Sequence, residues 1–356
     1  MKKIIFLVSE LTYGGTQKTI IKLVKRFVKD GYFITILTFE KKKNYNFSNK
    51  KIEYIPLNLL KDSNNLVSSL IENFKRIIFV RKILKKKSGN LICFLTSTNI
   101  IGLISNIFLK KKVILCERND IQKQPVAFLW RILRVLLYRF ANKITCNSSR
   151  SSNYLKNYVP EKKIFYVRNH IDIKKNLVTF PKKIILSVGR MHNQKGFDIL
   201  INGFKKSNTY KFGWKLFLVG DGYEKKNLIK LVKKLNLNKY IKFYNFSNPY
   251  KWYKKAGIFA LTSRYEGMPN VILEASSLKL PIIISRDTGG ATDFIINNKS
   301  GIVLKKNSYD ELGKKISELT KDKYLRLKLG NQAYKNLKYY NNFENIYKNW
   351  EKIIIK

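Results

Sequence analysis

The sequence predicts an α/β protein with two Rossmann-like, doubly wound parallel sheets, one in each half, that face each other across a cleft. Its 356 residues suit two domains of ordinary size. Short apolar runs alternate with longer stretches of helical period, which is the pattern of βαβ units. The alternation restarts after residues 173–182, an aperiodic linker with a proline. Such sheets bind ligands at the carboxyl ends of their strands, so the cleft is the expected site.

Residues 1–172 are expected to form the first domain. Its apolar runs predict strands at 3–8, 33–39, 52–56, 91–95, 113–116, 143–146 and 164–167. Amphipathic stretches between them predict helices at 16–29, 71–84, 126–141 and 151–158.

Residues 183–338 are expected to form the second domain. The predicted strands are 184–188, 215–219, 241–244, 258–261, 281–285 and 301–304. The predicted helices are 197–205, 223–235, 309–319 and 324–338. The end of the chain, 339–356, holds a further helix at 343–355, which is expected to pack back toward the first domain.

The formal net charge of +48 is spread along the whole chain. Residues 1–180 carry 36 basic and 10 acidic side chains, and the remainder carries 35 and 13. A nucleic-acid-binding protein more often concentrates arginine and aromatic residues along one element, so nucleic acid is not an expected partner. Two explanations of the charge are possible. One is a drift of the composition toward lysine codons, and the other is a function in attracting anionic membranes or phosphate-bearing substrates. Composition leaves both explanations open.

Cysteine usage and the N-terminus favour a cytoplasmic protein. The three cysteines form no C-x-x-C pair, which argues against a zinc site of that type and against a disulfide framework. The first apolar run ends at Ser9 and is too short for a signal peptide. The uncharged stretch 91–109 contains six Ser, Thr and Asn residues, which favour a strand, a polar turn and a buried helix over a membrane span.

The strongest local signal is the segment Ser263–Ala275, which follows a predicted strand. Gly267 permits a tight turn, and Pro269 suits the first position of a helix. The backbone N–H groups of the next three residues would then be available to an anion at the helix start. These residues are Asn270, Val271 and Ile272.

Two carboxylates flank this expected anion site. Glu266 lies in the loop before the helix, and Glu274 lies one turn inside it. Because carboxylates repel phosphate, they suit hydroxyl groups on either side of it, such as those of a sugar and of a ribose joined by a diphosphate. The alternative is a pair of ordinary glutamates near a helix start.

Two further motifs follow predicted first strands of each half. Arg190, after a strand and a glycine, and Lys195, before Gly196, could grip a diphosphate from two sides. In so basic a chain, solvated surface charge is the alternative. Gly14 and Gly15 would let the backbone approach a ligand closely, but no G-x-G-x-x-G is present, so a nicotinamide-binding site is not indicated.

Taken in order, these motifs resemble those of a glycosyltransferase of family 4, with the two-Rossmann-domain fold called GT-B. Six pieces carry the resemblance over nearly the whole chain: the Gly14-Gly15 loop, Asn169-x-Ile-Asp172, Gly-Arg190-x4-Lys195-Gly, Val-Gly-Asp-Gly222, Glu266-x7-Glu274 and Thr288-Gly289-Gly290. The resemblance implies a retaining, metal-independent transfer of a hexose or N-acetylhexosamine from a nucleotide sugar, by family habit a UDP-sugar. No cofactor is implied.

The resemblance also implies roles by position. Arg190 and Lys195 would bind the donor diphosphate, Glu266 the donor sugar and Glu274 the ribose. Residues 270–272 would offer backbone amides to the phosphates, within a second domain that binds the nucleotide sugar. Gly14 and Gly15 would close over the donor from a first domain that binds the acceptor. Attack would occur on the face that the diphosphate leaves, and the leaving phosphate oxygen would take the proton.

One departure from the family pattern concerns the acceptor side. Many relatives have a histidine after the strand predicted at 113–116, where this chain has Cys116-Glu-Arg-Asn-Asp120. A similar stretch occurs in a subset of capsule and lipid-linked oligosaccharide transferases, so the departure favours that subset among the capsule, lipopolysaccharide and lipid-linked oligosaccharide transferases that the chain resembles. Arg118 and Asn119 are then the candidates for contacting the acceptor.

Two helices of the first domain mix apolar and basic residues. They are 74–87 and 126–141, the second with Arg131, Arg134 and Arg139. Such helices suit a membrane interface, or they are core helices with a basic edge. If these helices bind a membrane interface, a lipid-linked acceptor and peripheral association with the inner face of the plasma membrane would fit.

Two other functions remain to be distinguished from a transferase. One is a nucleotide-sugar epimerase on the same scaffold, which needs acid–base groups that two histidines hardly supply. The other is a non-catalytic basic membrane-binding protein, which has no reason to hold two glutamates around a helix start.

Overall fold

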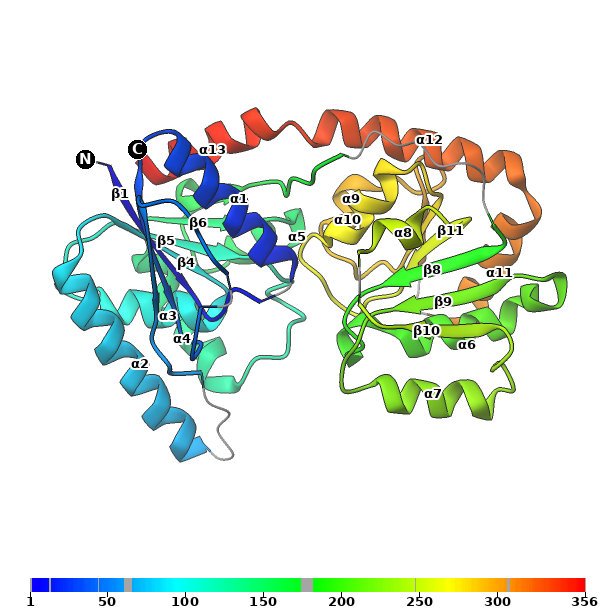
Figure 1. Ribbon diagram of the computed structural model, residues 1–356, viewed down its shortest axis with the longest axis horizontal. Helices are drawn as coiled ribbons and strands as arrows, with labels where there is room; N and C mark the ends of the chain where they lie inside the picture. Colours follow the sequence, from blue (N-terminus) through cyan, green and yellow to red (C-terminus); the bar gives the residue numbers. More distant parts are fainter. Residues whose placement is uncertain are drawn as a thin grey trace. The chain divides into compact units, whose positions relative to one another are not determined.

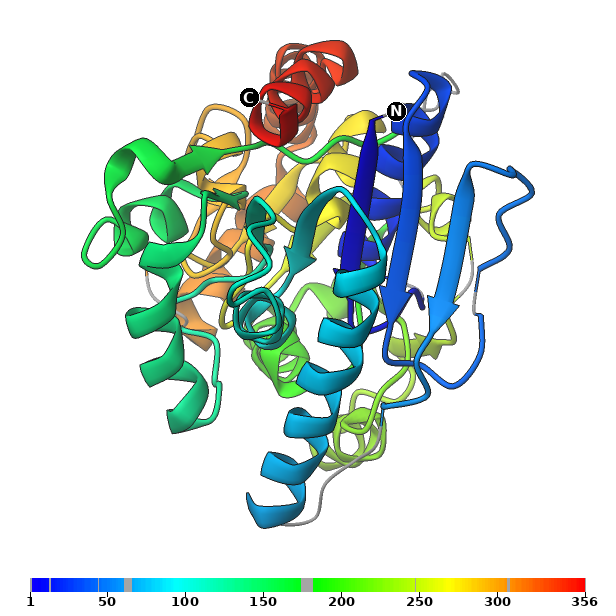
Figure 2. The same cartoon turned by 90° about the vertical axis from the view of Figure 1, so that its left-hand side faces the viewer.

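The computed structural model describes residues 2–12, 14–43, 45–60, 66–173, 182–246, 248–305 and 308–355. It divides the chain into two compact units, Met1–Val167 with Phe343–Lys356, and Arg168–Asn342. Figure 1 shows the elements of each unit, and Figure 2 shows β1, β2 and β3 of the first unit as neighbouring parallel arrows.

Within the described residues, the first unit contains a seven-stranded sheet in the order β3-β2-β1-β4-β5-β6-β7, and its paired strands are parallel. The strands are β1 (Lys3–Val8), β2 (Phe33–Thr38), β3 (Ile52–Pro56), β4 (Asn90–Phe94), β5 (Val113–Glu117), β6 (Lys143–Cys146) and β7 (Ile164–Tyr166). The helices are α1 (Gly15–Lys29), α2 (Leu66–Lys86), α3 (Thr96–Ser105), α4 (Phe128–Leu137), α5 (Ser149–Leu155) and α13 (Phe343–Ile355), with 3₁₀ turns at Tyr138–Phe140 and Glu161–Lys163.

Helices cover both faces of this sheet, so its strands are apolar on both sides. Along β1, Ile4 and Phe6 pack into a core that includes α1 and α13, whereas Ile5 and Leu7 pack into a second core beneath α2 and α3. This alternation follows from the two-residue period of a strand. All three cysteines are buried in these cores as free thiols.

The C-terminal helix α13 belongs to the first unit. The Nη1 atom of Arg26 in α1 lies 2.5 Å from a carboxylate oxygen of Glu344, and Trp350 is buried in the core shared with α1. Figure 1 shows α13 beside α1.

The second unit has a six-stranded sheet among the described residues, in the order β10-β9-β8-β11-β12-β13 and with parallel pairs. The strands are β8 (Ile184–Val188), β9 (Lys215–Val219), β10 (Ile241–Tyr244), β11 (Ile258–Leu261), β12 (Ile282–Ile284) and β13 (Ile302–Val303). The helices are α6 (Phe197–Ser207), α7 (Lys225–Lys234), α8 (Tyr250–Tyr253), α9 (Asn270–Ser277), α10 (Ala291–Phe294), α11 (Tyr309–Lys321) and α12 (Lys323–Tyr340), with 3₁₀ turns at Asn193–Lys195 and Thr209–Phe212.

Two layers of helices enclose this second sheet, as Figure 1 shows. One core joins the sheet to α8, α9 and α12, and the other joins it to α6, α7 and α11. The strand order reverses between β8 and β11, so the loops after these two strands diverge from the switch point of the sheet.

The two parallel sheets predicted from the sequence are therefore present. The first unit ends at Val167, five residues before the expected boundary at 172, because the following residues contact the end of α12. Arg168 stacks on Tyr340, and the N–H of Ile171 donates to Asn341 at 2.9 Å. Most of the expected linker, 174–181, lies outside the described residues. Helix α12 extends to Tyr340, so the chain passes into α13 at 341–342 rather than at 339.

No helix in the described part of the chain is both long and apolar enough to cross a bilayer.

Candidate functional site

The loop between β11 and α9 places Glu266 beside Lys195. Glu266 is 7% exposed. Its Oε1 atom accepts a hydrogen bond from Ser263 Oγ at 2.9 Å and forms an ion pair with Lys195 Nζ. Lys195 comes from the loop after β8, so two residues that are 71 positions apart meet at the switch point of the sheet.

The backbone conformation at position 196, directly after Lys195, requires a glycine. Its φ is +61°, and a Cβ atom there would lie 2.1 Å from the carbonyl oxygen of Thr262. In the protein this space lets Thr262 Oγ1 donate to the Gly196 carbonyl at 2.7 Å. Any side chain at 196 would therefore separate the two loops that bring Lys195 and Glu266 together.

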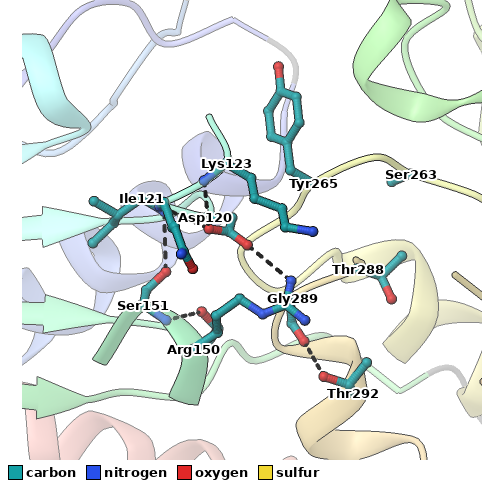
Figure 3. A network of polar contacts seen from close by, with 12 residues as sticks. Asp120, Ile121, Lys123, Arg150, Ser151, Ser263, Tyr265, Thr288, Gly289 and Thr292 are labelled. Carbon is teal, nitrogen blue, oxygen red and sulfur yellow. Dashed lines mark hydrogen bonds and ion pairs between the residues drawn. The ribbon is translucent and has the colours of Figure 1, made fainter. Parts of the chain in front are cut away.

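Gly289 performs a similar role on the other side of Glu266. Its φ is +52°, and a Cβ atom would lie 1.9 Å from the Glu266 carbonyl oxygen. The next residue, Gly290, donates its N–H to the Gly267 carbonyl at 2.5 Å. Figure 3 shows Thr288 and Gly289, with Thr292 Oγ1 donating to the Gly289 carbonyl at 2.7 Å. The left-handed turn is thus at Gly289, whereas Gly267 is not among the described residues with positive φ.

Helix α9 begins at Asn270, one residue later than expected. Pro269 is the N-cap, with extended backbone angles of −75° and 116°. The N–H of Ile272 donates to the Pro269 carbonyl at 3.1 Å, so this amide is already hydrogen-bonded within the turn. The expectation that residues 270–272 all present available amides is therefore wrong for Ile272. Val271 is the second residue of the helix.

The start of α9 is held by Asn169, a role that the sequence did not reveal. Asn169 Nδ2 donates to Asn270 Oδ1 at 2.9 Å and to the Met268 carbonyl at 3.0 Å. The only signal was the presence of Asn169 in one of the six motif pieces.

Glu274 is buried one turn inside α9, with 5% of its surface exposed. Tyr253 Oη, from α8, donates to Glu274 Oε2 at 3.0 Å. Burial and the neighbouring carboxylate both raise the pKa of the Tyr253 phenol, so it remains a donor at physiological pH. Tyr253 carries no motif that would have marked it.

Arg190 and His192 occupy the same loop as Lys195. Arg190 is exposed, and its positive charge acts on both His192 and Tyr265. Burial lowers the pKa of the His192 imidazole, and the charges of Arg190 and Lys195 lower it further. The His192 ring packs on Tyr223, with ring centroids 4.6 Å apart.

In the first unit, Gly14 is the N-cap of α1 and Gly15 is its first residue. Gly14 has a φ of −178°, an extended conformation open to any residue. Both follow β1, which borders β4 where the order of the first sheet reverses. Leu95, directly after β4, has a φ of +77°, a conformation that disfavours a side chain.

Arg118 is buried in the first unit. Its guanidinium lies 4.9 Å from the Trp350 ring centroid and donates to Thr145 Oγ1 at 3.0 Å. These contacts connect α13 to β6, so the structure gives Arg118 a supporting role within the unit. Asn119 is partly exposed and accepts the N–H of Asp120 at 3.0 Å.

Asp120 organises the loop after β5, as Figure 3 shows. Its Oδ1 accepts the N–H of Lys123 at 3.1 Å, and its Oδ2 lies 3.4 Å from Arg150 Nη1. The N–H of Ile121 donates to Ser151 Oγ at 3.5 Å. The loop that carries Asn119 is therefore tied to the start of α5.

Behind this loop, Glu117 is fully buried at the end of β5. It accepts hydrogen bonds from Thr96 Oγ1 at 3.0 Å, from Asn99 Nδ2 at 3.2 Å and from Tyr138 Oη. Burial raises the pKa of the Glu117 carboxyl, although these donors and the charge of Arg134 oppose the rise. Glu117 thus stabilises the first turn of α3.

A cavity of about 380 Å³ lies at the amino-terminal ends of β1 to β3, away from these loops.

Among the described residues, no group of three or more His, Cys, Asp or Glu side chains could hold a metal ion. The second unit therefore places the carboxylates of Glu266 and Glu274, the cations of Lys195 and Arg190 and the start of α9 in the loops and helix that follow β8 and β11. This combination suits a phosphorylated ligand with hydroxyl groups.

Comparison with known proteins gives consistent results. Residues 169–336 match the family described as glycosyl transferases group 1. The amylovoran biosynthesis glycosyltransferase AmsD of Erwinia amylovora is 31% identical over 262 residues, 71% of this chain and 73% of that protein. A second relative is an α-1,4-N-acetyl-D-galactosaminyltransferase of Campylobacter jejuni, named for a GalNAc-containing saccharide on undecaprenol diphosphate. It is 26% identical over 99% of this chain and 98% of that protein.

Solved structures resemble both units. A sucrose-phosphate synthase from Thermosynechococcus elongatus aligns with a TM-score of 0.85 at 16% identity, over 99% of this chain and 98% of that one. HepE of Anabaena, solved in complex with UDP-glucose, aligns with a TM-score of 0.79 at 17% identity, over 99% of each chain. At these identities the likeness establishes the fold.

Proposed function

Because this chain belongs to the group 1 glycosyltransferases and has their GT-B fold, we propose that it moves a hexose or N-acetylhexosamine from a UDP-sugar to a sugar hydroxyl of a lipid-linked or surface-polysaccharide acceptor. We propose further that the transfer retains the anomeric configuration and needs no metal. The observation that supports this most is the Glu266–Lys195 pair at the switch point of the second sheet.

The donor would lie along this switch point. The buried carboxylate of Glu266 suits the donor sugar hydroxyls, and that of Glu274, held by Tyr253, suits the ribose. Lys195 and Arg190 would contact the diphosphate between them. Two carboxylates and two cations thus match a ligand with hydroxyl groups at both ends and negative charge in the middle.

The reaction would proceed by attack on the face that the diphosphate leaves. The acceptor oxygen bonds to the anomeric carbon as the bond to the phosphate oxygen breaks, and that oxygen takes the acceptor proton. Negative charge grows on the leaving group, where Lys195 and Arg190 would stabilise it. Preorganised charge of this kind is usually the largest catalytic contribution.

The choice of substrates rests on relatives. UDP is favoured because HepE was solved with UDP-glucose. A lipid-linked acceptor is favoured because the Campylobacter relatives are named for acceptors on an undecaprenyl diphosphate. In the first unit, the partly exposed Asn119 is a better candidate for contacting the acceptor than the buried Arg118.

Peripheral binding to an anionic membrane would bring the enzyme to such an acceptor. Helix α4 supports this because its apolar side chains point outward, with Phe128 74% and Leu136 52% exposed. Arg131 of α4 and Arg139 of the 3₁₀ turn that follows it are exposed, whereas Arg134 is buried. Helix α2 also exposes apolar side chains, including Val67 and Phe74. Apolar faces with basic edges are suited to a membrane interface.

The test is a panel of UDP- and GDP-sugars, offered with and without a polyprenyl-diphosphate-linked oligosaccharide and in the presence of EDTA. We expect transfer from one UDP-sugar, with an α-linked product by NMR. A β-linked product would contradict retention, and loss of transfer in EDTA would contradict metal independence. Interconversion of nucleotide sugars without an acceptor would identify an epimerase, and no reaction at all would favour a binding protein.

In the same assay, Glu266→Ala should lower turnover by about a hundredfold or more, because it removes a preorganised group at the reacting sugar. Binding of UDP, measured by calorimetry, should survive. The control is Glu318→Ala on α11, an exposed glutamate paired with Lys315. Unchanged turnover in Glu266→Ala would remove Glu266 from the mechanism.

A further inference from the structure

Two segments of the second unit are joined along their length beside the Glu266–Lys195 pair. The first is 193–198, the end of the loop after β8 with the first turn of α6, and the second is 262–266, the loop after β11. Glu266 and Lys195 make the contact at one end of this junction, which we name the loop clamp.

Arg264 makes three side-chain hydrogen bonds across the loop clamp. Its Nη1 and Nη2 atoms bind the two carboxylate oxygens of Asp198 at 2.9 and 2.6 Å. Nη1 also donates to the carbonyl of Asn193 at 2.7 Å. The planar guanidinium therefore binds a side chain on α6 and a backbone carbonyl two residues before Lys195.

The backbone reinforces the same alignment. The N–H of Arg264 donates to the Gln194 carbonyl at 2.8 Å, and Gln194 Nε2 donates to the Tyr265 carbonyl at 3.0 Å. Lys195 follows Gln194 and Glu266 follows Tyr265. Each of the two proposed donor-binding residues is therefore next to a residue that these hydrogen bonds fix in place. A shift of one loop along the other would break them together.

We infer that Arg264 is a positioning residue of the donor site, which acts through Asp198 and the Asn193 carbonyl to keep Lys195 and Glu266 in register. This inference rests on the proposed function, in which these two residues contact the diphosphate and the sugar. Arg264 itself contacts neither group. It sets where the ammonium and the carboxylate lie relative to each other.

Global stabilisation does not account for this arrangement. The Arg264 and Asp198 side chains are 33% and 36% exposed, and ion pairs exposed to this degree contribute little to folding. A bidentate guanidinium–carboxylate pair, by contrast, has well-defined geometry. Small displacements of catalytic groups can cost about a hundredfold in rate. Loss of the pair should therefore affect turnover much more than the melting temperature.

The experiment compares Arg264→Gln, Arg264→Lys, Asp198→Asn and the double variant Asp198→Asn/Arg264→Gln with the full-length enzyme. Arg264→Gln should lower kcat by about ten- to a hundredfold, with the donor KM and the UDP dissociation constant changed less than about threefold. Arg264→Lys should recover part of kcat, since lysine keeps the charge but lacks the planar fork. The double variant should be no slower than the slower single variant, because both changes break one contact.

The matched control is Lys206→Gln, which breaks an exposed ion pair with Asp310 at the other end of the same helix α6. It should leave kcat unchanged. A second readout is independent of activity: backbone hydrogen–deuterium exchange should rise in 189–198 and 262–268 in Arg264→Gln and stay unchanged in the control.

Full kcat in Arg264→Gln, with unchanged exchange in both segments, would overturn the positioning role even if the wild type transfers sugar as proposed. Additive losses in the double variant would also overturn it. If the wild type transfers no sugar, the proposed function fails, and the exchange measurement alone decides whether Arg264 aligns the two loops.

Discussion

Glu266 and Glu274 are both buried carboxylates eight residues apart, yet their neighbours differ. Glu266 is paired with a cation, Lys195, whereas Glu274 receives a hydrogen bond from a neutral phenol, Tyr253. An ammonium beside Glu266 fits a position next to phosphate, and the phenol that donates to Glu274 fits a carboxylate that binds hydroxyl groups. This contrast supports the assignment of Glu274 to the ribose.

We therefore expect Glu274→Ala to weaken UDP binding by about tenfold or more, since a hydrogen bond to a charged group contributes about 1.5–3 kcal/mol. Glu266→Ala should weaken UDP binding less, because UDP lacks the donor sugar. Isothermal titration calorimetry with UDP measures both affinities. Equal losses in the two variants would contradict this division of roles.

His192 should make the stability of the second unit depend on pH. Its folded-state pKa is lowered, first by burial and then by the charges of Arg190 and Lys195, while Glu224 opposes the shift. The folded protein therefore binds a proton less readily than the unfolded chain. As the pH falls through the unfolded pKa of about 6.5, the unfolded state takes up the proton first and stability is lost.

We expect the melting temperature of His192→Gln, relative to that of the wild type, to be higher at pH 5.5 than at pH 8. At pH 8 the imidazole is neutral in both the folded and the unfolded protein. Differential scanning calorimetry at the two pH values measures the gain. The same difference between variant and wild type at both pH values would show that titration of His192 does not contribute.

At the scale of elements, the strands were the most predictable part. Buried parallel strands are near-continuous apolar runs, and β1, β8 and β11 coincide with such runs. Helix ends were less predictable because they depend on tertiary contacts. The short helices α8 and α10, of four residues each, have too few turns to show a period. Helix α2 starts five residues before the predicted start at 71.

Helix α4 shows what a sequence pattern leaves open. Its mixture of apolar and basic residues predicted a basic face toward the membrane or solvent. Instead, Arg134 is 3% exposed and donates to the Ile121 carbonyl at 3.0 Å, while Phe128 and Leu136 point outward. The buried Glu117 lies close enough for the charge of Arg134 to act against the burial that raises the pKa of its carboxyl. A carboxylate 17 residues away in sequence could not be linked to Arg134 by periodicity.

The candidate site likewise has residues that the sequence predicted and residues that it did not. Lys195 and Glu266 were both predicted, because each belongs to a motif at the end of a strand, and the structure brings them together. Arg264 and Asp198, 66 residues apart, were not predicted as partners. In a chain with 71 basic side chains, no local pattern marks Arg264 as the partner of Asp198.

For the whole molecule, the net charge of +48 has two explanations, which differ in the exposed surface that each requires. Drift toward lysine codons would place lysines on every exposed surface, as on α7, where Lys226 and Lys230 are exposed. Membrane attachment needs apolar surface as well, and α4 and α2 expose it in the first unit. Charge should therefore attract the protein to anionic lipid, and the apolar face of α4 should hold it there.

This model predicts flotation with anionic vesicles, weaker flotation with neutral ones, and a steep loss as salt rises, since charge is screened over about 8 Å at physiological ionic strength. Arg131→Gln/Arg139→Gln should weaken binding by about 1 kcal/mol per charge. Phe128→Ser/Leu136→Ser should weaken it even at low salt. Arg134 is left intact because it is buried. The matched control, Lys226→Gln/Lys230→Gln on α7, loses the same charge and should float like the wild type. If it weakens as much as the α4 variants, or if the protein ignores lipid charge, then α4 is not the membrane-binding element.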